Sequence, residues 1–232
     1  SGPNWQPLGL GEGGYLEFDP RDGSTIFSDT WSANLSSVTA DTATDLSIDT
    51  MEKGLGDYRH LLAISRITSG LLLAIKKDGR LARSTTGGVR TGGPPAWLDV
   101  PAFQTGLKLS AVQFAPSDDQ HAYVGSEDGS VFHSADKGVH WIRIDGDPLP
   151  DAAIRRITVD WRDPKRIYVG LARTLPPQQG HRHQSLQIFR GDIDEGTAVW
   201  TNVSGPEPST LPQVDVTGLA LHPDHEDVIY AS

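Results

Sequence analysis

Seven side chains in this sequence are our candidates for binding a ligand, and they fall in three short groups. A Trp or Tyr ring can stack on a sugar or on another side chain, and an Arg can hold a carboxylate through two parallel hydrogen bonds. The seven residues are Asp29, Trp31, Asp57, Tyr58, Arg59, His181 and His183. We predict that loops bring them to one ligand-binding face, where nearby acidic residues favour neutral glycans or basic protein segments over polyanions.

The two histidines raise the question of a metal site. Alternate residues of a strand share a face, so His181 and His183 could both contact one ion. The sequence offers no third ligand for them, and we predict neither a metal site nor a cofactor. Both lie in the longest insertion, residues 173–185. Such loops are often functional, although a solvated loop that merely tolerates insertion explains the segment equally well.

Strands with a recurring pattern would position these loops. Each copy has two apolar residues two positions apart, one further residue, then Pro or Trp, and an aromatic residue seven positions later. Val112-Gln113-Phe114-Ala115-Pro116 with Tyr123 is one copy. Apolar residues spaced by two lie on one face of a strand, and Pro with Asp or Ser favours a turn. The second apolar residue marks each copy: Phe18, Ile64 (in a weaker copy), Phe114, Val159 and Leu221.

Intervals of about 45 to 62 residues between copies are typical of four-stranded propeller blades. We therefore predict an all-β propeller of antiparallel blades, with about four blades and a split or truncated fifth. The predicted blades span 14–58, 59–106, 107–152, 153–212, and 213–232 together with 4–9. Their first two strands should cover 15–29, 60–76, 109–125, 154–171 and 216–231. Less than about a fifth of the chain should be helical, because the apolar spacing is two.

A motif in the third repeat connects the sequence to a family. Ser134-Ala135-Asp136-Lys137-Gly138-Val139-His140-Trp141 fits the pattern Ser-x-Asp-x-Gly-x-x-Trp. On these residues the chain resembles BNR/Asp-box propellers, the superfamily of sialidases, sortilin and xyloglucanases. The resemblance implies a turn between the third and fourth strands of a blade, with structural roles for Ser134, Asp136, Gly138 and Trp141. Asp136 would accept hydrogen bonds from turn amides, and Trp141 would be largely buried against the neighbouring blade.

Related features recur elsewhere. Degenerate copies of the motif stand at Thr86-Gly87-Gly88 and at Asp194-Glu195-Gly196. A Trp followed three positions later by an aliphatic residue also recurs; the pairs are Trp5 with Leu8, Trp97 with Val100, Trp141 with Ile144, and Trp200 with Val203.

The resemblance leaves two functions open. The first is a non-catalytic propeller that recognises a glycan or a protein. The alternative is part of a glycoside hydrolase of the xyloglucanase type, because Trp5, residues 11–14, Phe18 and Phe27 follow the order of that family's opening. Asp29 would then be one carboxylate and Trp31 a sugar platform. Hydrolysis needs two carboxylates, and the second would come from outside this chain. Sialidases of this fold carry an early Arg-Ile-Pro motif that is missing here.

Composition narrows the possible partners. The 232 residues include 30 acidic and 20 basic side chains, a net charge of −10, and no cysteine. An acidic chain disfavours nucleic-acid binding, and no apolar run reaches the length of a membrane helix. We expect a secreted or periplasmic protein. Either the chain ends meet in a small five-bladed ring, or the chain belongs to a longer one with further blades, which is our expectation.

Overall fold

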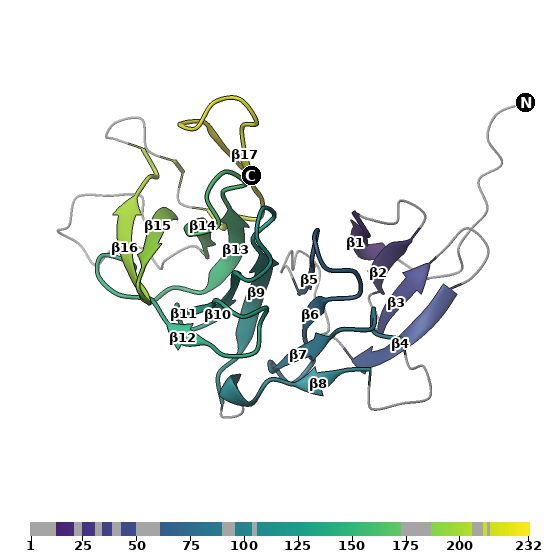
Figure 1. Cartoon of the computed structure of the whole chain (residues 1–232). Helices are drawn as coiled ribbons and strands as arrows, with labels where there is room; N and C mark the ends of the chain where they lie inside the picture. The colour runs from purple at the N-terminus through teal and green to yellow at the C-terminus, as the bar shows by residue number, and fades with distance from the viewer. Residues whose placement is uncertain are drawn as a thin grey trace, which may run out of the picture.

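A computed structural model describes residues 13–20, 25–30, 34–38, 43–49, 61–89, 96–103, 106–172, 187–205, 211–212 and 214–232. These residues form four four-stranded antiparallel sheets and one two-stranded sheet (Figure 1). We call the sheets blades one to five in chain order. The predicted all-β class is confirmed, since the 3-10 turn η1 (Pro101–Phe103) is the only helical segment within the described ranges. Those ranges hold no helix able to span a membrane.

The strands follow the chain in order within every blade. Blade one contains β1 (Gly13–Phe18), β2 (Ile26–Thr30), β3 (Asn34–Val38) and β4 (Ala43–Asp49). Blade two contains β5 (Leu62–Ile64), β6 (Leu72–Ile75), β7 (Leu81–Ser84) and β8 (Leu98–Asp99). Blade three contains β9 (Leu109–Phe114), β10 (Ala122–Ser126), β11 (Val131–Ser134) and β12 (Ile142–Arg143). Blade four contains β13 (Ile154–Val159), β14 (Arg166–Leu171), β15 (Ile188–Asp194) and β16 (Thr197–Asn202). Blade five contains β17 (Leu219–Leu221) and β18 (Ile229–Ala231). All five predicted strand pairs are present.

One hydrogen bond recurs in every blade and fixes the repeat. The residue after each marker position donates its amide to a carbonyl six residues later, which closes the turn between the first and second strands. The pairs are Asp19 to Thr25 (2.9 Å), Ser65 to Leu71 (3.0 Å), Ala115 to His121 (2.9 Å), Asp160 to Arg166 (2.8 Å) and His222 to Val228 (3.0 Å). The five marker residues chosen from the sequence are therefore structurally equivalent.

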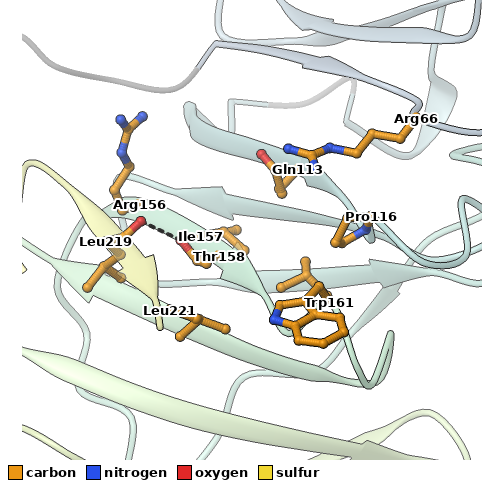
Figure 2. Close-up of a pocket in the computed structure, with 10 residues that line it drawn as sticks. Arg66, Gln113, Pro116, Arg156, Ile157, Thr158, Trp161, Leu219 and Leu221 are labelled. Atoms are coloured by element: carbon orange, nitrogen blue, oxygen red, sulfur yellow. Dashed lines mark hydrogen bonds between the residues drawn. The ribbon is translucent and has the colours of Figure 1, made fainter. Parts of the chain in front are cut away.

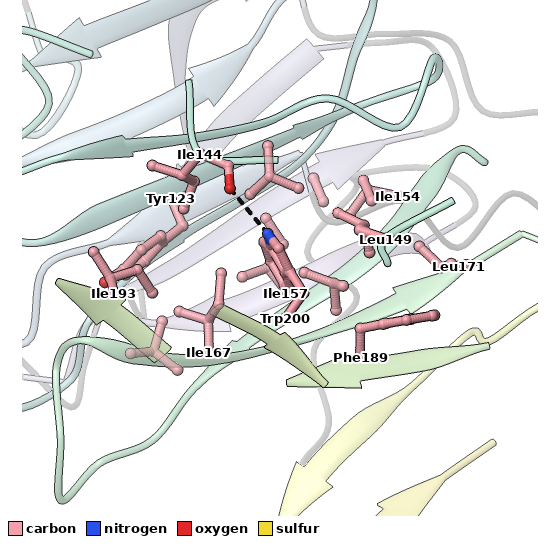
Figure 3. Packing of buried hydrophobic residues seen from close by; sticks show 14 of the residues in the cluster. Tyr123, Ile144, Leu149, Ile154, Ile157, Ile167, Leu171, Phe189, Ile193 and Trp200 are labelled. Carbon is pink, nitrogen blue, oxygen red and sulfur yellow. Dashed lines mark hydrogen bonds between the residues drawn. The ribbon is translucent and has the colours of Figure 1, made fainter. Parts of the chain in front are cut away.

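The core lies between neighbouring blades. Because side chains alternate along a strand, β6 presents Leu72 to a cluster shared with Phe27 of blade one and Leu73 to a cluster shared with Phe114 of blade three. A third cluster joins blades three and four, with Tyr123 among its members (Figure 3). Burial on both faces explains why the second strands β6, β10 and β14 are largely apolar along their length.

Two glycines allow the blades to approach closely. A Cβ at Gly125 in β10 would stand 2.5 Å from Ile154 Cγ2, and a Cβ at Gly170 in β14 would stand 2.5 Å from Val216 Cγ1. Both glycines come two residues after the repeat's Tyr. Any larger residue there would push the next blade away.

The recurring Trp side chains pack against the preceding blade. Trp97 packs on the blade one–two cluster, Trp141 on the blade two–three cluster, and Trp200 lies within the blade three–four cluster. Trp200 is 5% exposed. Trp141, which we expected to be largely buried, is only half-buried, because it stands in a turn ahead of the short strand β12 rather than inside a strand.

Candidate functional site

A pocket of about 310 Å³ lies where the first strands of blades three, four and five meet (Figure 2). These strands contact one another across the blade boundaries, β9 with β13 and β13 with β17. The lining residues are Arg66, Gln113, Pro116, Arg156, Ile157, Thr158, Val159, Trp161, Leu219 and Leu221. We call this the inner-strand pocket.

Trp161 is the main aromatic group of the inner-strand pocket. It occupies the position at which two other repeats have Pro116 and Pro223, two residues after the end of β13. The turn places it at the surface, and it is 48% exposed. Arg162 lies over the Trp161 ring, with Cζ 4.1 Å from the ring centroid, a cation–π arrangement.

Blade five holds Arg162 in place. Its Nη2 donates to Pro223 O at 2.6 Å, and its guanidinium lies 3.7 Å from the buried carboxylate of Asp160 and 3.8 Å from Glu226. These contacts fix the cation on the Trp161 ring. The indole is therefore a preorganised platform with an exposed surface.

Polar groups accompany this platform. Figure 2 shows the Arg66 guanidinium near the Gln113 amide, whereas Arg156 extends from β13 on the opposite side of the pocket. Thr158 donates its hydroxyl to Leu219 O at 3.1 Å, which joins blade four to blade five. Arg156 Nη1 is buried without a hydrogen-bond partner among the described residues. The lining thus has two guanidinium groups and no carboxylate.

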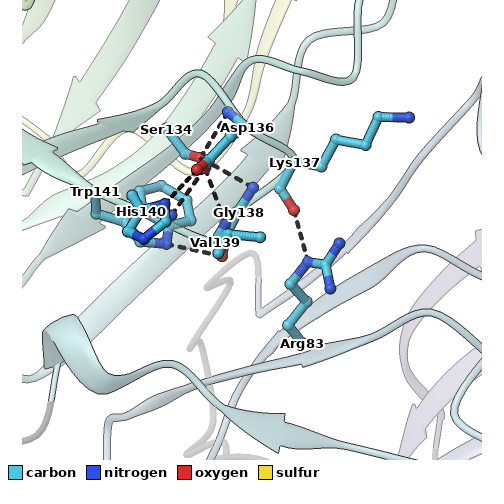
Figure 4. Close-up of polar contacts among 8 residues, drawn as sticks. All are labelled: Arg83, Ser134, Asp136, Lys137, Gly138, Val139, His140 and Trp141. Carbon is cyan, nitrogen blue, oxygen red and sulfur yellow. Dashed lines mark hydrogen bonds and ion pairs between the residues drawn. The ribbon is translucent and has the colours of Figure 1, made fainter.

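The Ser134–Trp141 turn forms a second polar cluster (Figure 4). Ser134 Oγ accepts hydrogen bonds from the Asp136 amide (3.3 Å) and the Gly138 amide (2.9 Å). Asp136 Oδ1 accepts from the amides of Val139 (3.1 Å) and His140 (2.8 Å), so the hydrogen bonds predicted for Asp136 are present. Trp141 Nε1 donates to Gly138 O at 3.0 Å.

Electrostatics agrees with this arrangement. Burial acts to raise the pKa of Asp136, but hydrogen bonds from the amide and ring of His140 and from Ser134 outweigh it and lower the pKa to about 2. The carboxylate is therefore held in its charged form, as an acceptor for turn amides rather than as a proton donor.

The same turn fastens blade three to blade two. Lys137 Nζ donates to Thr68 Oγ1 at 2.8 Å and pairs with buried Asp119 at 3.3 Å. Lys137 O accepts from Arg83 Nε at 2.7 Å. Lys137 and Gly138 both have positive φ, 61° and 82°, and a Cβ at Gly138 would stand 2.9 Å from Leu73 Cδ2. These contacts join the turn to blade two.

Blade two repeats the turn, and blade four does not. Ser84 Oγ accepts from the amides of Thr86 (3.2 Å) and Gly88 (2.9 Å), as Ser134 does in blade three. At Asp194-Glu195-Gly196 the predicted copy is wrong. Asp194 pairs directly with Thr197, and positive φ at Glu195 (42°) and Gly196 (86°) suits a two-residue hairpin turn.

Most of the predicted ligand-binding residues lie outside the described residues. They are Trp31, Asp57, Tyr58, Arg59, His181 and His183. The backbone of Asp29 lies in β2, one residue before its end, and pairs with Leu35, but its side chain is not described. Across the described ranges no group of three His, Cys, Asp or Glu side chains could hold a metal ion.

Sequence reasoning did not find the inner-strand pocket. Three of its residues, Arg66, Pro116 and Trp161, come from turns between first and second strands. These turns share an end of the blades with the Ser134–Trp141 turn, because the Lys137 amide donates to Gln120 O at 3.0 Å. The predicted ligand face is the opposite end. Trp161 and Arg66 in the repeat position of Pro116 were the available signal, whereas nothing in the pattern marked Arg156.

Comparisons with known proteins support the architecture. No family model and no curated protein sequence matches the chain. The chain is similar to the crystal structure of an ancestral GH74 enzyme, with a TM-score of 0.64 and 17% identity, covering 100% of this chain and 29% of that one. The chain folds as a β-propeller.

Two further solved structures have the same architecture. The GH74 xyloglucanase from Xanthomonas campestris matches with a TM-score of 0.57 and 18% identity, over 93% of this chain and 33% of that one. The computationally designed Ika8 protein matches with a TM-score of 0.58 and 16% identity, over 95% of this chain and 57% of that one. This propeller therefore spans about a third of the GH74 chains.

Proposed function

We propose that this propeller recognises a saccharide, which stacks on Trp161 in the inner-strand pocket. The observation that carries the proposal is the 48% exposed indole, fixed on one side by Arg162 and lining a pocket with Gln113 and Thr158. Aromatic rings bind the apolar faces of ligands while polar neighbours fix their orientation. Hydrolysis of a glycosidic bond requires two carboxylates, and the lining of this pocket supplies donors and apolar groups instead.

Calorimetric titration against a saccharide panel tests the proposal. We expect Trp161→Ala to weaken binding about tenfold or more, as loss of a central aromatic contact does. Tyr230→Ala is the matched control, because Tyr230 is 56% exposed and does not line the pocket. Equal effects of the two substitutions, or binding that ignores Trp161, would contradict the proposal.

A glycoside hydrolase is the second candidate, supported by the names of the GH74 structures. In that case Asp29 supplies one carboxylate and a part of the protein outside this chain supplies the other. Xyloglucan oligosaccharides belong in the panel for this reason. Release of reducing ends by the full gene product, abolished by Asp29→Asn and unaffected by Trp161→Ala, would favour this candidate over recognition in the inner-strand pocket.

A further inference from the structure

Five of the nine arginines that the structure describes pair with a carboxylate. Examples are Arg80 with Asp78 at 2.5 Å, Arg143 with Asp145 at 2.7 Å and Arg166 with Asp192 at 2.7 Å. In contrast, Arg66 and Arg156 have no carboxylate partner among the described residues. In a chain with ten more acidic than basic groups, two unpaired cations in one pocket leave room for an external anion.

The environment of Arg156 also favours an external anion. Its Nη1 is buried and makes no hydrogen bond within the described part of the chain. A buried donor without an acceptor costs free energy, and a charged guanidinium without one costs more. A ligand carboxylate fits the fork of N–H groups and would satisfy it.

Two described carboxylates lie beside the Trp161 platform, those of Asp160 and Glu226, and both face Arg162. The carboxylate nearest in sequence to Trp161 is Asp160, which is 2% exposed and accepts a hydrogen bond from the Arg162 amide at 2.9 Å. Asp160 is thus committed to its own turn. The free charge within the pocket lining is positive.

We infer that the saccharide is acidic and carries carboxylates on more than one ring. This inference rests on the proposed function. Arg66 and Arg156 project from different blades on opposite sides of the pocket (Figure 2), so they suit two separate acidic groups. Trp161 would stack on a sugar ring between or beside them. An oligosaccharide of uronic acids has this chemistry, with a ring face for the indole and a carboxylate on each unit.

The experiment uses the 232-residue chain and oligogalacturonates of two to four units, with their methyl esters as neutral counterparts of the same rings. We expect the acids to bind at least about tenfold more tightly than the esters, with an affinity that falls as salt rises. Arg66→Gln and Arg156→Gln should each remove about tenfold or more of the acid affinity and leave ester binding nearly unchanged. Arg155→Gln is the matched control, because Arg155 adjoins Arg156 on β13 and does not line the pocket.

The outcomes separate two claims: that the pocket binds a saccharide, and that this saccharide is acidic. Equal affinity for acids and esters, still dependent on Trp161, overturns the inference and keeps the proposed function. Loss of affinity in Arg155→Gln equal to that in Arg156→Gln also overturns it, since the effect would then be general charge. A poly-glutamate peptide is a carboxylate ligand without sugar rings. If no saccharide binds, whether or not this peptide binds, both the proposed function and the inference are overturned. Circular dichroism and denaturant melts confirm that each variant is folded before its affinity is compared.

Discussion

The indole nitrogen of Trp200 donates a hydrogen bond to Ile144 O at 2.9 Å, across the boundary between blades three and four (Figure 3). The ring is 5% exposed and lies against Gly191, where a Cβ would stand 2.8 Å from the indole. One side chain thus contributes both packing and a directional bond to this boundary.

We expect Trp200→Ala to lower the free energy of unfolding by about 3–5 kcal/mol, the range for emptying a large buried aromatic site. Trp200→Phe should cost less, because it keeps part of the packing and loses the bond to Ile144. Trp141→Ala should cost less than Trp200→Ala, since Trp141 is only half-buried. Denaturant unfolding compares the three variants, and an equal or greater loss for Trp141→Ala would show that burial does not rank these sites.

The Ser134–Trp141 turn depends on the Asp136 carboxylate. Asp136→Ala removes the acceptor of two amide hydrogen bonds, and we expect a loss of about 1–2 kcal/mol in unfolding free energy. Asp136→Asn keeps one carbonyl oxygen and should lose less. Thr86→Ala at the equivalent position of blade two is the matched control. Loss of ligand binding in a fully folded Asp136→Ala protein would show that the turn is not purely structural.

Much of this fold could be predicted from the sequence because the repeat is local. Val112, Phe114 and Tyr123 keep their spacing for a physical reason, since both faces of blade three are buried. The same spacing recurs with the five equivalent turn bonds. The inner-strand pocket could not be predicted, because Arg66 and Arg156 meet only through packing of different blades. The half-burial of Trp141 depends on the length of β12, which the motif does not set.

Close approach of the blades at Gly125 gives a further prediction. A Cβ there would stand 2.5 Å from Ile154 Cγ2, so Gly125→Ala should destabilise the protein by about 1–3 kcal/mol through overpacking. Ile154→Ala removes Cγ1 and Cγ2, two of the three atoms that the new Cβ would meet. We expect the double variant to recover part of the loss of Gly125→Ala, as measured by a double-mutant cycle. Strict additivity of the two substitutions would argue against this contact.

The contact between half-buried His121 and buried His133 predicts sensitivity to acid. His121 Nδ1 lies 2.8 Å from His133 Nε2, and His133 stacks on Tyr123 with ring centroids 4.9 Å apart. Burial, followed by the charges of His121 and Lys165, lowers the pKa of His133 to about 4. Between about pH 4 and about pH 6.5, His133 is protonated in the unfolded chain and neutral in the folded chain. The free energy of unfolding should therefore fall as pH drops from about 6.5 to about 4.

The loss from His133 should amount to about 2–3 kcal/mol between pH 7 and pH 4. His133→Gln should flatten this part of the stability profile, even if the variant is less stable at pH 7. His225→Gln, at an exposed turn of blade five, should leave the profile unchanged. Denaturant midpoints across pH 4 to 7 provide the measurement, and a His133→Gln profile as steep as the original would contradict the assignment.

Recognition in the inner-strand pocket is tested most directly by locating the residues that a bound saccharide contacts. The chain has six tryptophans, so two-dimensional NMR of the indole N–H groups, assigned by single Trp→Phe variants, reports on Trp161 and Trp31 in one titration. We predict that titration with an acidic oligosaccharide shifts the Trp161 signal and leaves that of Trp31 unchanged. A shift of Trp31 with an unmoved Trp161 would place the ligand at the residues predicted from the sequence and contradict recognition in the inner-strand pocket.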